Sequence, residues 1–175
     1  MSVRVELAPA EEADEQILVN LLQLYLHDLS EFEPIEPSPD AEFRYPYLSH
    51  FWVEPGRFAF FIMVNHELAG FAFVRSGSDL VGDDWAMELA EFFVLRSYRH
   101  KGVGRTAAFS LLAKFPGPWV VGVIEGNVGA VSFWDHVIPA FTHQTFQRDP
   151  VSAGDRNWVV YQFEAPGSIM DRASG

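Results

Sequence analysis

Helical periodicity of apolar residues marks three segments of the chain. Within Glu11–Ser30, apolar side chains recur every three or four residues, which predicts a helix with one apolar face. The same spacing predicts a second helix over Gly102–Phe115, which Pro116 would end because proline cannot donate a helical hydrogen bond. A third, shorter helix is expected over about Val128–Val137.

Seven further runs predict strands. They are Val3–Leu7, Arg57–Val64, Leu68–Val74, Trp85–Leu95, Trp119–Ile124, Thr142–Arg148 and Trp158–Glu164. Only Asn65, His66 and Glu67 separate the second run from the third, which indicates an antiparallel hairpin. The order of strands and helices predicts an α/β domain with a mixed sheet. We expect one domain over residues 1–165 and a flexible tail over residues 166–175.

The composition is that of a single folded domain. The chain has 175 residues, of which 49 % are apolar, and it contains no cysteine, which excludes disulfides and thiolate nucleophiles. The six histidines include no pair at helical ligand spacing, so no metal site is expected. No apolar run reaches the roughly 18 residues of a membrane span, and the N-terminus lacks the pattern of a secretory signal. We therefore expect a cytoplasmic protein.

The chain is acidic, with a net charge of −12. This charge disfavours nucleic acid and anionic membranes as partners and favours cationic ligands, although solubility alone would also explain it. Four of the twelve basic residues nevertheless lie in one ten-residue window: Arg96, Arg99, Lys101 and Arg105. Because Gly102 and Gly104 lie in the same window, we expect an anion to bind there.

A strand is expected to end, and a helix to begin, close to Gly102 and Gly104. The first turn of a helix has unpaired backbone N–H groups and partial positive charge. Glycines let a phosphate approach these groups, and Arg99 and Lys101 can add charged hydrogen bonds, so the segment is typical of a pyrophosphate cradle. The chain lacks the Gly-Lys-Ser/Thr of a P-loop, and Ala107 replaces the third glycine of a dinucleotide fingerprint. The alternative is that the glycines only shape a tight turn.

The segment Arg99-His-Lys-Gly-Val-Gly104 resembles the Arg/Gln-x-x-Gly-x-Gly/Ala signature of the GNAT acetyltransferases. A second block, from Asn127 to Trp134, resembles the Asn-x-x-Ala-x-x-Phe/Leu-Tyr sequence of that family's fourth helix. The resemblance implies a mixed, mostly antiparallel sheet of about seven strands, flanked by about four helices, in which strands four and five splay apart. It also implies acetyl-coenzyme A as the cosubstrate.

The resemblance further implies which residues bind coenzyme A. Backbone N–H groups of six consecutive residues would hold the pyrophosphate, with Arg105 beside them: Arg99, His100, Lys101, Gly102, Val103 and Gly104. Backbone groups near Phe93, Val94 and Leu95 would bind the pantetheine arm between the splayed strands, and one N–H there would polarise the thioester carbonyl. Asn127 would contact the cofactor near its thiol end, and the indole of Trp134 would pack on the pantetheine arm.

The proton donor is open in the sequence. Many family members use a tyrosine on the fourth helix to protonate the departing thiolate, but Trp134 stands at that position and indole has no useful acidity. Water, the ammonium of the acceptor or another residue would have to supply the proton. Tyr98 and Tyr161 are two candidates.

The base is open as well. An amine nucleophile must lose a proton, and two glutamates of the predicted fourth strand are candidates. Glu88 lies six residues before Val94, where some family members carry their acid–base residue. Glu91 is nearer the cofactor segment but lies on the opposite face of the strand unless a bulge intervenes.

These observations lead to three functional hypotheses. We expect an acetyl-CoA-dependent N-acetyltransferase that transfers the acetyl group directly, in a ternary complex, to a small amine or an amino-terminal group. The alternative is a catalytically inactive acyl-CoA-binding sensor or regulatory module, which Trp134 keeps open. A nucleotide-binding interaction domain fits less well, because the phosphate motif is not of a nucleotide type. The acidic loops favour a cationic acceptor, and the sequence leaves a homodimer open.

Overall fold

The computed structural model describes residues 3–167, in which seven strands form one sheet flanked by four α-helices. The strands are β1 (Val5–Pro9), β2 (Arg57–Val64), β3 (Glu67–Ser78), β4 (Asp83–Val94), β5 (Gly117–Ile124), β6 (Gln147–Ala153) and β7 (Arg156–Ala165). The helices are α1 (Glu15–Leu29), α2 (His50–Val53), α3 (Val103–Lys114) and α4 (Val128–Phe141). The sheet has the order β1-β2-β3-β4-β5-β7-β6, and only β4 and β5 pair in parallel. The predicted mixed, mostly antiparallel sheet is confirmed.

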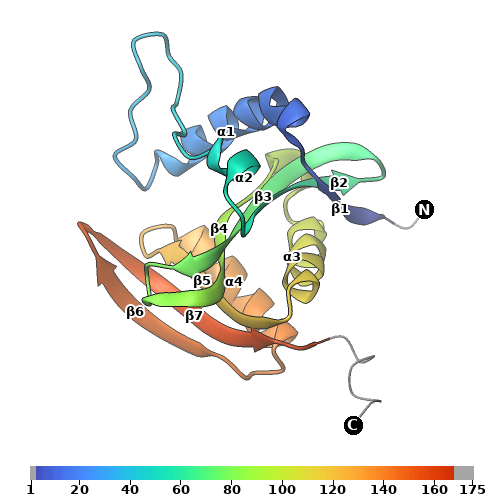
Figure 1. The fold of residues 1–175 in the computed structure, drawn as a ribbon, viewed down its shortest axis with the longest axis vertical. Helices are drawn as coiled ribbons and strands as arrows, with labels where there is room; N and C mark the ends of the chain where they lie inside the picture. Colours follow the sequence, from blue (N-terminus) through green and yellow to red (C-terminus); the bar gives the residue numbers. More distant parts are fainter. Residues whose placement is uncertain (1–2, 168–175) are drawn as a thin grey trace.

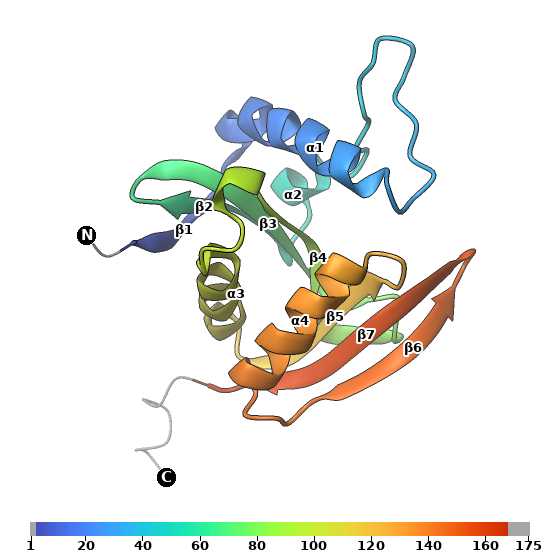
Figure 2. The same ribbon diagram turned by 180° about the vertical axis from the view of Figure 1, so that it is seen from behind.

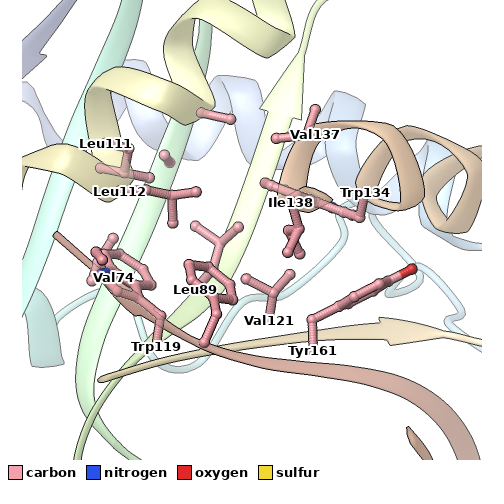
Figure 3. Close-up of a cluster of buried hydrophobic side chains, with 14 of the residues drawn as sticks. Val74, Leu89, Leu111, Leu112, Trp119, Val121, Trp134, Val137, Ile138 and Tyr161 are labelled. Atoms are coloured by element: carbon pink, nitrogen blue, oxygen red, sulfur yellow. The ribbon is translucent and has the colours of Figure 1, made fainter. Parts of the chain in front are cut away.

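Helices cover both faces of this sheet (Figures 1 and 2). Successive side chains of a strand point to opposite faces, and β3 shows this clearly. Phe71 and Phe73 pack with leucines of α1, whereas Ala72 and Val74 pack with α3 and α4. Figure 3 shows the second interface, where side chains of both helices meet side chains of the sheet. The labelled residues are Leu111, Leu112, Trp134, Val137 and Ile138 on the helices and Val74, Leu89, Trp119, Val121 and Tyr161 on the strands.

The predicted hairpin after Arg57–Val64 is confirmed. β2 and β3 are joined by a two-residue turn at Asn65 and His66, whose φ angles are +50° and +70°. Two consecutive residues with positive φ give the turn whose twist matches that of antiparallel strands.

One extra residue in β4 brings Glu88 and Glu91 to the same face of the sheet. Glu88 pairs with Arg75 and Glu91 pairs with Phe73, two residues away on β3, so that three steps along β4 correspond to two along β3. A bulge of this kind shifts the alternation of side chains by one position. The sequence places Glu91 on the opposite face of the strand unless a bulge intervenes, and this bulge brings it to the same face as Glu88.

The predicted splay of the fourth and fifth strands is confirmed. β4 and β5 pair only where Met87–Leu89 lies beside Trp119–Val121. Past the bulge β4 continues to Val94 and β5 to Ile124, but these parts do not pair with each other. β5 instead pairs along its whole length with β7. The outer edge of β4 therefore has backbone groups without a strand beside them.

The last helix and the strand after it differ from the sequence prediction. The strand predicted over Thr142–Arg148 is wrong: α4 continues through Pro139 to Phe141, and β6 begins only at Gln147. Phe141 packs on Phe109 with ring centroids 5.4 Å apart, which anchors the final turn although proline lacks the N–H. β6 is a polar edge strand with mostly exposed side chains, so its sequence has no apolar alternation to predict it.

Smaller differences occur near the ends of the chain. The first strand is β1 at Val5–Pro9 rather than Val3–Leu7, and the first helix begins at Glu15, after a turn of 3-10 helix over Glu12–Asp14. Except for Pro166 and Gly167, the tail predicted over residues 166–175 lies outside the described residues.

Candidate functional site

A cavity of about 590 Å³ opens beside the unpaired edge of β4. Its lining comes from three parts of the fold: α1 and the loop after it, the end of β4 with the turn into α3, and the first turns of α4. The lining residues include Tyr25, Asp28, Glu31, Phe92, Phe93, Val94, Arg96, Arg99, His100, Gly102, Gly104, Arg105, Asn127, Phe133 and Trp134. The cavity thus brings together the two sequence blocks on which the family resemblance rests.

The turn into α3 has the backbone of an anion cradle. Gly102 is the N-cap of α3 with a φ of +79°, and His100 just before it has a φ of +59°. A Cβ on Gly102 would meet no atom within 4 Å, so the space beside this glycine is open. The N–H groups of Val103 and Gly104 follow in the first turn of the helix, where they have no helical partner. The Val103 side chain is fully buried, so only its backbone is available to a ligand.

Gly104 has a packing role in addition. A Cβ on Gly104 would lie 3.1 Å from Cε2 of Phe133 and 3.7 Å from Cγ2 of Val94. A contact of 3.1 Å requires the neighbouring ring to shift, and the ring belongs to α4. The second glycine of the motif therefore lets α3 lie close to α4.

The arginine of the motif fastens β4 to α1. Arg99 donates from Nε to the carbonyl oxygen of Val94 at 2.7 Å and from a terminal nitrogen to Asp28 of α1 at 2.7 Å. Arg96 donates to the other carboxylate oxygen of Asp28 at 2.6 Å. Partial burial opposes ionisation of Asp28, but the two guanidinium groups hold its pKa below the usual value. This cross-link fixes the strand end from which the cradle starts.

The other basic residues of the window lie at the rim of the cradle. Lys101 donates from Nζ to the carbonyl oxygen of Ser97 at 2.7 Å, and the Arg105 guanidinium lies 5.2 Å from the ring centroid of Phe109. In this structure the donors of Arg99 and Lys101 that the sequence assigned to phosphate are thus engaged with protein oxygens. Arg105 and His100 line the cavity.

The backbone of β4 alternates between its two edges. Leu95 donates its N–H to Ala69 of β3 at 2.8 Å, so its backbone faces β3. Neighbouring residues of an antiparallel strand direct their backbone groups to opposite edges, so the N–H of Val94 faces the splay, as does that of Phe92. Phe92 was not singled out from the sequence. Of the three expected residues Phe93, Val94 and Leu95, only Val94 turns its N–H toward the cavity side.

The start of α4 supplies the opposite wall. The Asn127 side chain caps the helix by accepting from the N–H of Ala130 at 3.0 Å, and its amide nitrogen has no partner among residues 3–167. Trp134 is 5 % exposed and packs against Phe92 and Phe133, at centroid distances of 5.3 and 4.9 Å. Its ring therefore lies between α4 and Phe92 of β4. Figure 3 shows Trp134 on the side of α4 that faces the sheet.

Glu88 is an internally neutralised carboxylate. It is buried, and it accepts one hydrogen bond from Nε of Arg75 at 2.9 Å and another from the Ser78 hydroxyl. Arg75 also contacts Asp79 at 3.2 Å. Arg75 and Ser78 thus engage both carboxyl oxygens of Glu88, and neither Glu88 nor these two donors line the cavity.

Glu91 has a different environment. It accepts hydrogen bonds from the hydroxyls of Tyr25 and Tyr45, the latter at 3.1 Å, and no salt bridge to it occurs among residues 3–167. Burial raises the pKa of Glu91 to about 7, although the two hydroxyl donors act in the opposite direction. A carboxyl group with this pKa can take up and release a proton near neutral pH.

The tyrosines of the site were missed by the sequence reasoning. Tyr25 lines the cavity, whereas the two tyrosines considered from the sequence do not. Tyr161 donates to Asp135 at 2.8 Å on the β7 side of α4, and Tyr98 packs in the cluster under α3. Tyr25 lies 66 residues from Glu91 in the chain, so no spacing could have joined them.

Two classes of site receive no support from the described residues. Between residues 3 and 167 no group of three or more histidine, aspartate or glutamate side chains is arranged to hold a metal ion. None of the helices in this range is long and apolar enough to cross a membrane.

Comparison with known proteins places this site in a family. A sequence profile of the Acetyltransferase (GNAT) family matches residues 20–137, more than half of the chain. Comparison with curated protein sequences finds no significant match. Among solved structures, an acetyltransferase from Thermus thermophilus is 19 % identical with a TM-score of 0.68, and the match covers 91 % of this chain and 96 % of that one.

Two further solved structures share the fold at low identity. The spermidine N-acetyltransferase of Vibrio cholerae, in complex with CoA and spermine, is 14 % identical with a TM-score of 0.61, covering 91 % of this chain and 95 % of that one. The ribosomal-protein-S18-alanine N-acetyltransferase of Escherichia coli is 13 % identical with a TM-score of 0.58, covering 95 % and 97 %. From the profile match, the order and splay of the strands and the glycine turn before α3, we conclude that the chain belongs to the GNAT acetyltransferase family.

Proposed function

We propose that this protein transfers the acetyl group of acetyl-CoA directly to an amine bound beside it. The observation that carries the proposal is one cavity whose lining includes both the glycine turn before α3 and Tyr25, the hydrogen-bond partner of Glu91. A thioester bound along β4 would bring its acyl group into this cavity. Direct transfer needs both substrates side by side, and a single cavity lined by both groups supports this.

The residues present fit coenzyme A. The positive φ of Gly102 and the open space beside it let a phosphate reach the N–H groups at the start of α3. Three arginines line the cavity, Arg96, Arg99 and Arg105, and Arg105 has no salt bridge among residues 3–167, so its charge can offset that of the phosphates. The backbone N–H groups of Phe92 and Val94 face the splay, where an extended pantetheine arm can pair with them as a strand would. Asn127 lines the same cavity, and its amide nitrogen has no partner in the part of the chain that the structure describes.

We assign the base to Glu91. A general base works best when its pKa lies near the operating pH, and burial raises the pKa of Glu91 to about 7. Glu88 is held by Arg75 and Ser78, neither of which lines the cavity, whereas Glu91 is hydrogen-bonded to Tyr25, which does. Both residues lie on the same face, so Glu88 serves as the matched control for Glu91 in any mutational test.

The cavity has one carboxylate without an ion pair among residues 3–167, that of Glu31. Asp28 also lines the cavity but is paired with Arg96 and Arg99, and the buried Glu33 is 2.7 Å from Arg156 of β7. Glu31 and the acidic net charge of the chain support a cationic acceptor. Two structural neighbours act on acceptors of different kinds, according to their names: spermidine and an alanine of ribosomal protein S18. We propose a small amine or an amino-terminal group as the acceptor class.

An amine-library screen tests this function. The protein would be incubated with acetyl-CoA and each amine, and free thiol release would be measured together with the mass of the acetylated product. Acetylated product from at least one cationic amine is the expected result. Tight binding of acetyl-CoA without transfer to any amine would instead support the inactive acyl-CoA-binding module, for which Trp134 at the usual position of the acid is the one argument in the site.

A further inference from the structure

The proton held by Glu91 has one visible route into the cavity. Glu91 is not among the residues that line the cavity, whereas Tyr25 is, and the Tyr25 hydroxyl donates to Oε2 of Glu91. Tyr45 donates to the other oxygen of the same carboxylate at 3.1 Å but does not line the cavity. Tyr25 is therefore the residue that both lines the cavity and is hydrogen-bonded to the carboxylate.

The ring of Tyr25 is held in place on the sheet. It packs at right angles to Phe71, with centroids 5.7 Å apart, and against Phe93 at 5.7 Å. Phe93 and Val94 line the cavity directly beside it. The ring packing and the hydrogen bond to Glu91 thus hold the Tyr25 side chain in one position beside the end of β4.

The usual proton donor of this reaction type is missing from α4. Trp134 has an indole N–H, which can donate a hydrogen bond but cannot give up a proton. Of the tyrosines described, Tyr161 is bound to Asp135 away from the cavity and Tyr98 is packed under α3. Tyr25 is the tyrosine that faces the cavity.

We propose that Tyr25 is a catalytic residue that carries the proton of the acceptor amine to Glu91 and then returns it to the sulfur of coenzyme A. As the amine nitrogen forms its bond to the thioester carbon, its proton passes to the Tyr25 oxygen and the Tyr25 proton passes to Glu91. As the carbon–sulfur bond breaks, Glu91 returns its proton to Tyr25, and the Tyr25 proton passes to sulfur. The amine proton thus ends on the thiol, and Tyr25 and Glu91 regain their starting forms. This inference rests on the proposed function.

The direction of the second transfer is favourable. Burial raises the pKa of Glu91 to about 7, and a thiol has a pKa of about 8.5, so a proton moves downhill from Glu91 to the thiolate. Burial and the nearby Glu91 hold the pKa of Tyr25 well above its usual value, so the phenol does not give up its proton alone and the two transfers are concerted. The charged and titratable groups that face this pair are Tyr45, Arg75, Glu88 and Glu33.

The experiment compares Tyr25→Phe with Tyr45→Phe. Each variant removes one hydroxyl from the same carboxylate and keeps the ring, so each removes one hydrogen bond to Glu91, but only Tyr25 faces the cavity. With an amine found by screening, we expect Tyr25→Phe to lower kcat at least 10-fold more than Tyr45→Phe does, with similar movement of the pH profile. Equal losses in the two variants would overturn the relay.

A binding measurement gives a readout that does not depend on turnover. The thiol pKa of bound coenzyme A is obtained from the ultraviolet absorbance of the thiolate as pH is varied. A hydroxyl that donates to the thiolate lowers this pKa, so Tyr25→Phe should raise it by about one, and Tyr45→Phe should leave it in place. An unchanged thiol pKa in Tyr25→Phe contradicts the inference even if the wild-type protein acetylates no amine, which separates this failure from failure of the proposed function.

Two further variants protect the test against loss of folding. Fluorotyrosine at position 25 keeps the shape of the ring and makes the hydroxyl more acidic, so it should lower the thiol pKa of bound coenzyme A below that of the wild type. An unchanged value overturns the contact. In a Glu91→Gln background, Tyr25→Phe should cause little further loss of kcat, because glutamine cannot accept the proton that Tyr25 would pass on. Losses that multiply would show that the two residues act separately.

Discussion

Gly104 and Phe133 lie in contact across the α3–α4 interface, so closely that a Cβ on the glycine would be 3.1 Å from the phenylalanine ring. Gly102, two residues earlier, faces open space but holds a φ of +79°. The two glycines of the motif are thus needed for different reasons: one for packing and one for backbone conformation. Substitutions at the two positions therefore have different consequences.

Gly102→Ala should weaken binding of coenzyme A with a modest loss of stability. A left-handed conformation costs a residue with a Cβ roughly 1–2 kcal/mol, and relief of this strain would move the N–H groups of the cradle. Gly102→Asn is the matched control, since asparagine tolerates this region better. Calorimetric titration with coenzyme A and thermal unfolding measure the two effects. Affinity retained in Gly102→Ala would show that the cradle does not depend on this turn.

Gly104→Val should lower the free energy of unfolding as well as the affinity. The added side chain collides with Phe133 and Val94, and overpacking of this kind typically costs about 1–3 kcal/mol. The double variant Gly104→Val with Phe133→Ala should recover part of the stability, because the ring that collides is removed. Denaturant unfolding of the single and double variants checks this; a fully folded, equally stable Gly104→Val would contradict the packing role.

Arg99→Ala should weaken coenzyme A binding by about 1.5–3 kcal/mol, the range for hydrogen bonds that involve a charged group. The loss arises because the Val94 carbonyl loses its 2.7 Å donor and the end of β4 is no longer fixed to α1. Asp28→Asn isolates the second part, since it weakens the ion pair and keeps the contact with Val94. Titration of both variants with coenzyme A measures the difference. Equal losses would assign the effect to the link with α1 alone.

The sequence predicts what is local and misses what the fold brings together. The Gly102–Gly104 turn could be predicted because its residues are adjacent and its conformation follows from the absence of a Cβ. The edge strand β6 could not, since its exposed polar residues have no periodic pattern. The position of Glu91 depends on a bulge in β4, and its hydrogen bond to Tyr25 depends on the packing of α1 over the sheet. Neither the bulge nor this hydrogen bond can be predicted from the spacing of residues in the sequence.

Glu91→Gln should lower kcat by about 10²–10⁴-fold while leaving the affinity for acetyl-CoA nearly intact, because the amide keeps the shape and loses the basicity. In the wild type, kcat should rise with pH through a limb near 7, where Glu91 becomes charged. Glu88→Gln should cost less and should leave that limb in place. A larger loss in Glu88→Gln, measured in the same steady-state assay, would move the role of base to Glu88.

The same carboxyl group should make the protein less stable at high pH. The pKa of Glu91 is raised to about 7 in the folded state, above its usual value, so the folded state binds the extra proton. Its contribution to stability is fully present at low pH, below the unfolded pKa, and is lost as pH rises through about 7. The free energy of unfolding of Glu91→Gln relative to the wild type should therefore increase between pH 5 and pH 8, by no more than about 3 kcal/mol. Urea unfolding at several pH values measures this, and a difference that does not change with pH would contradict the raised pKa.

Trp134 occupies the position of the usual acid, and its replacement tests whether the missing acid limits the protein. The ring is buried between Phe92 and Phe133, so Trp134→Phe keeps an aromatic contact but opens space, and we expect kcat to fall by less than about tenfold because no proton donor is lost. Trp134→Tyr restores a hydroxyl on α4, yet it should raise kcat by no more than a few fold if Tyr25 already protonates the thiolate.

Tryptophan and tyrosine at position 134 can also be compared in the Tyr25→Phe background. There, Trp134→Tyr should recover much of the lost rate, because the new hydroxyl offers the sulfur a donor in place of Tyr25. Steady-state kinetics of these four variants and the wild type decide the matter. A large gain from Trp134→Tyr in the otherwise native chain would show that no native residue protonates the thiolate, which is the result expected of an inactive acyl-CoA-binding module.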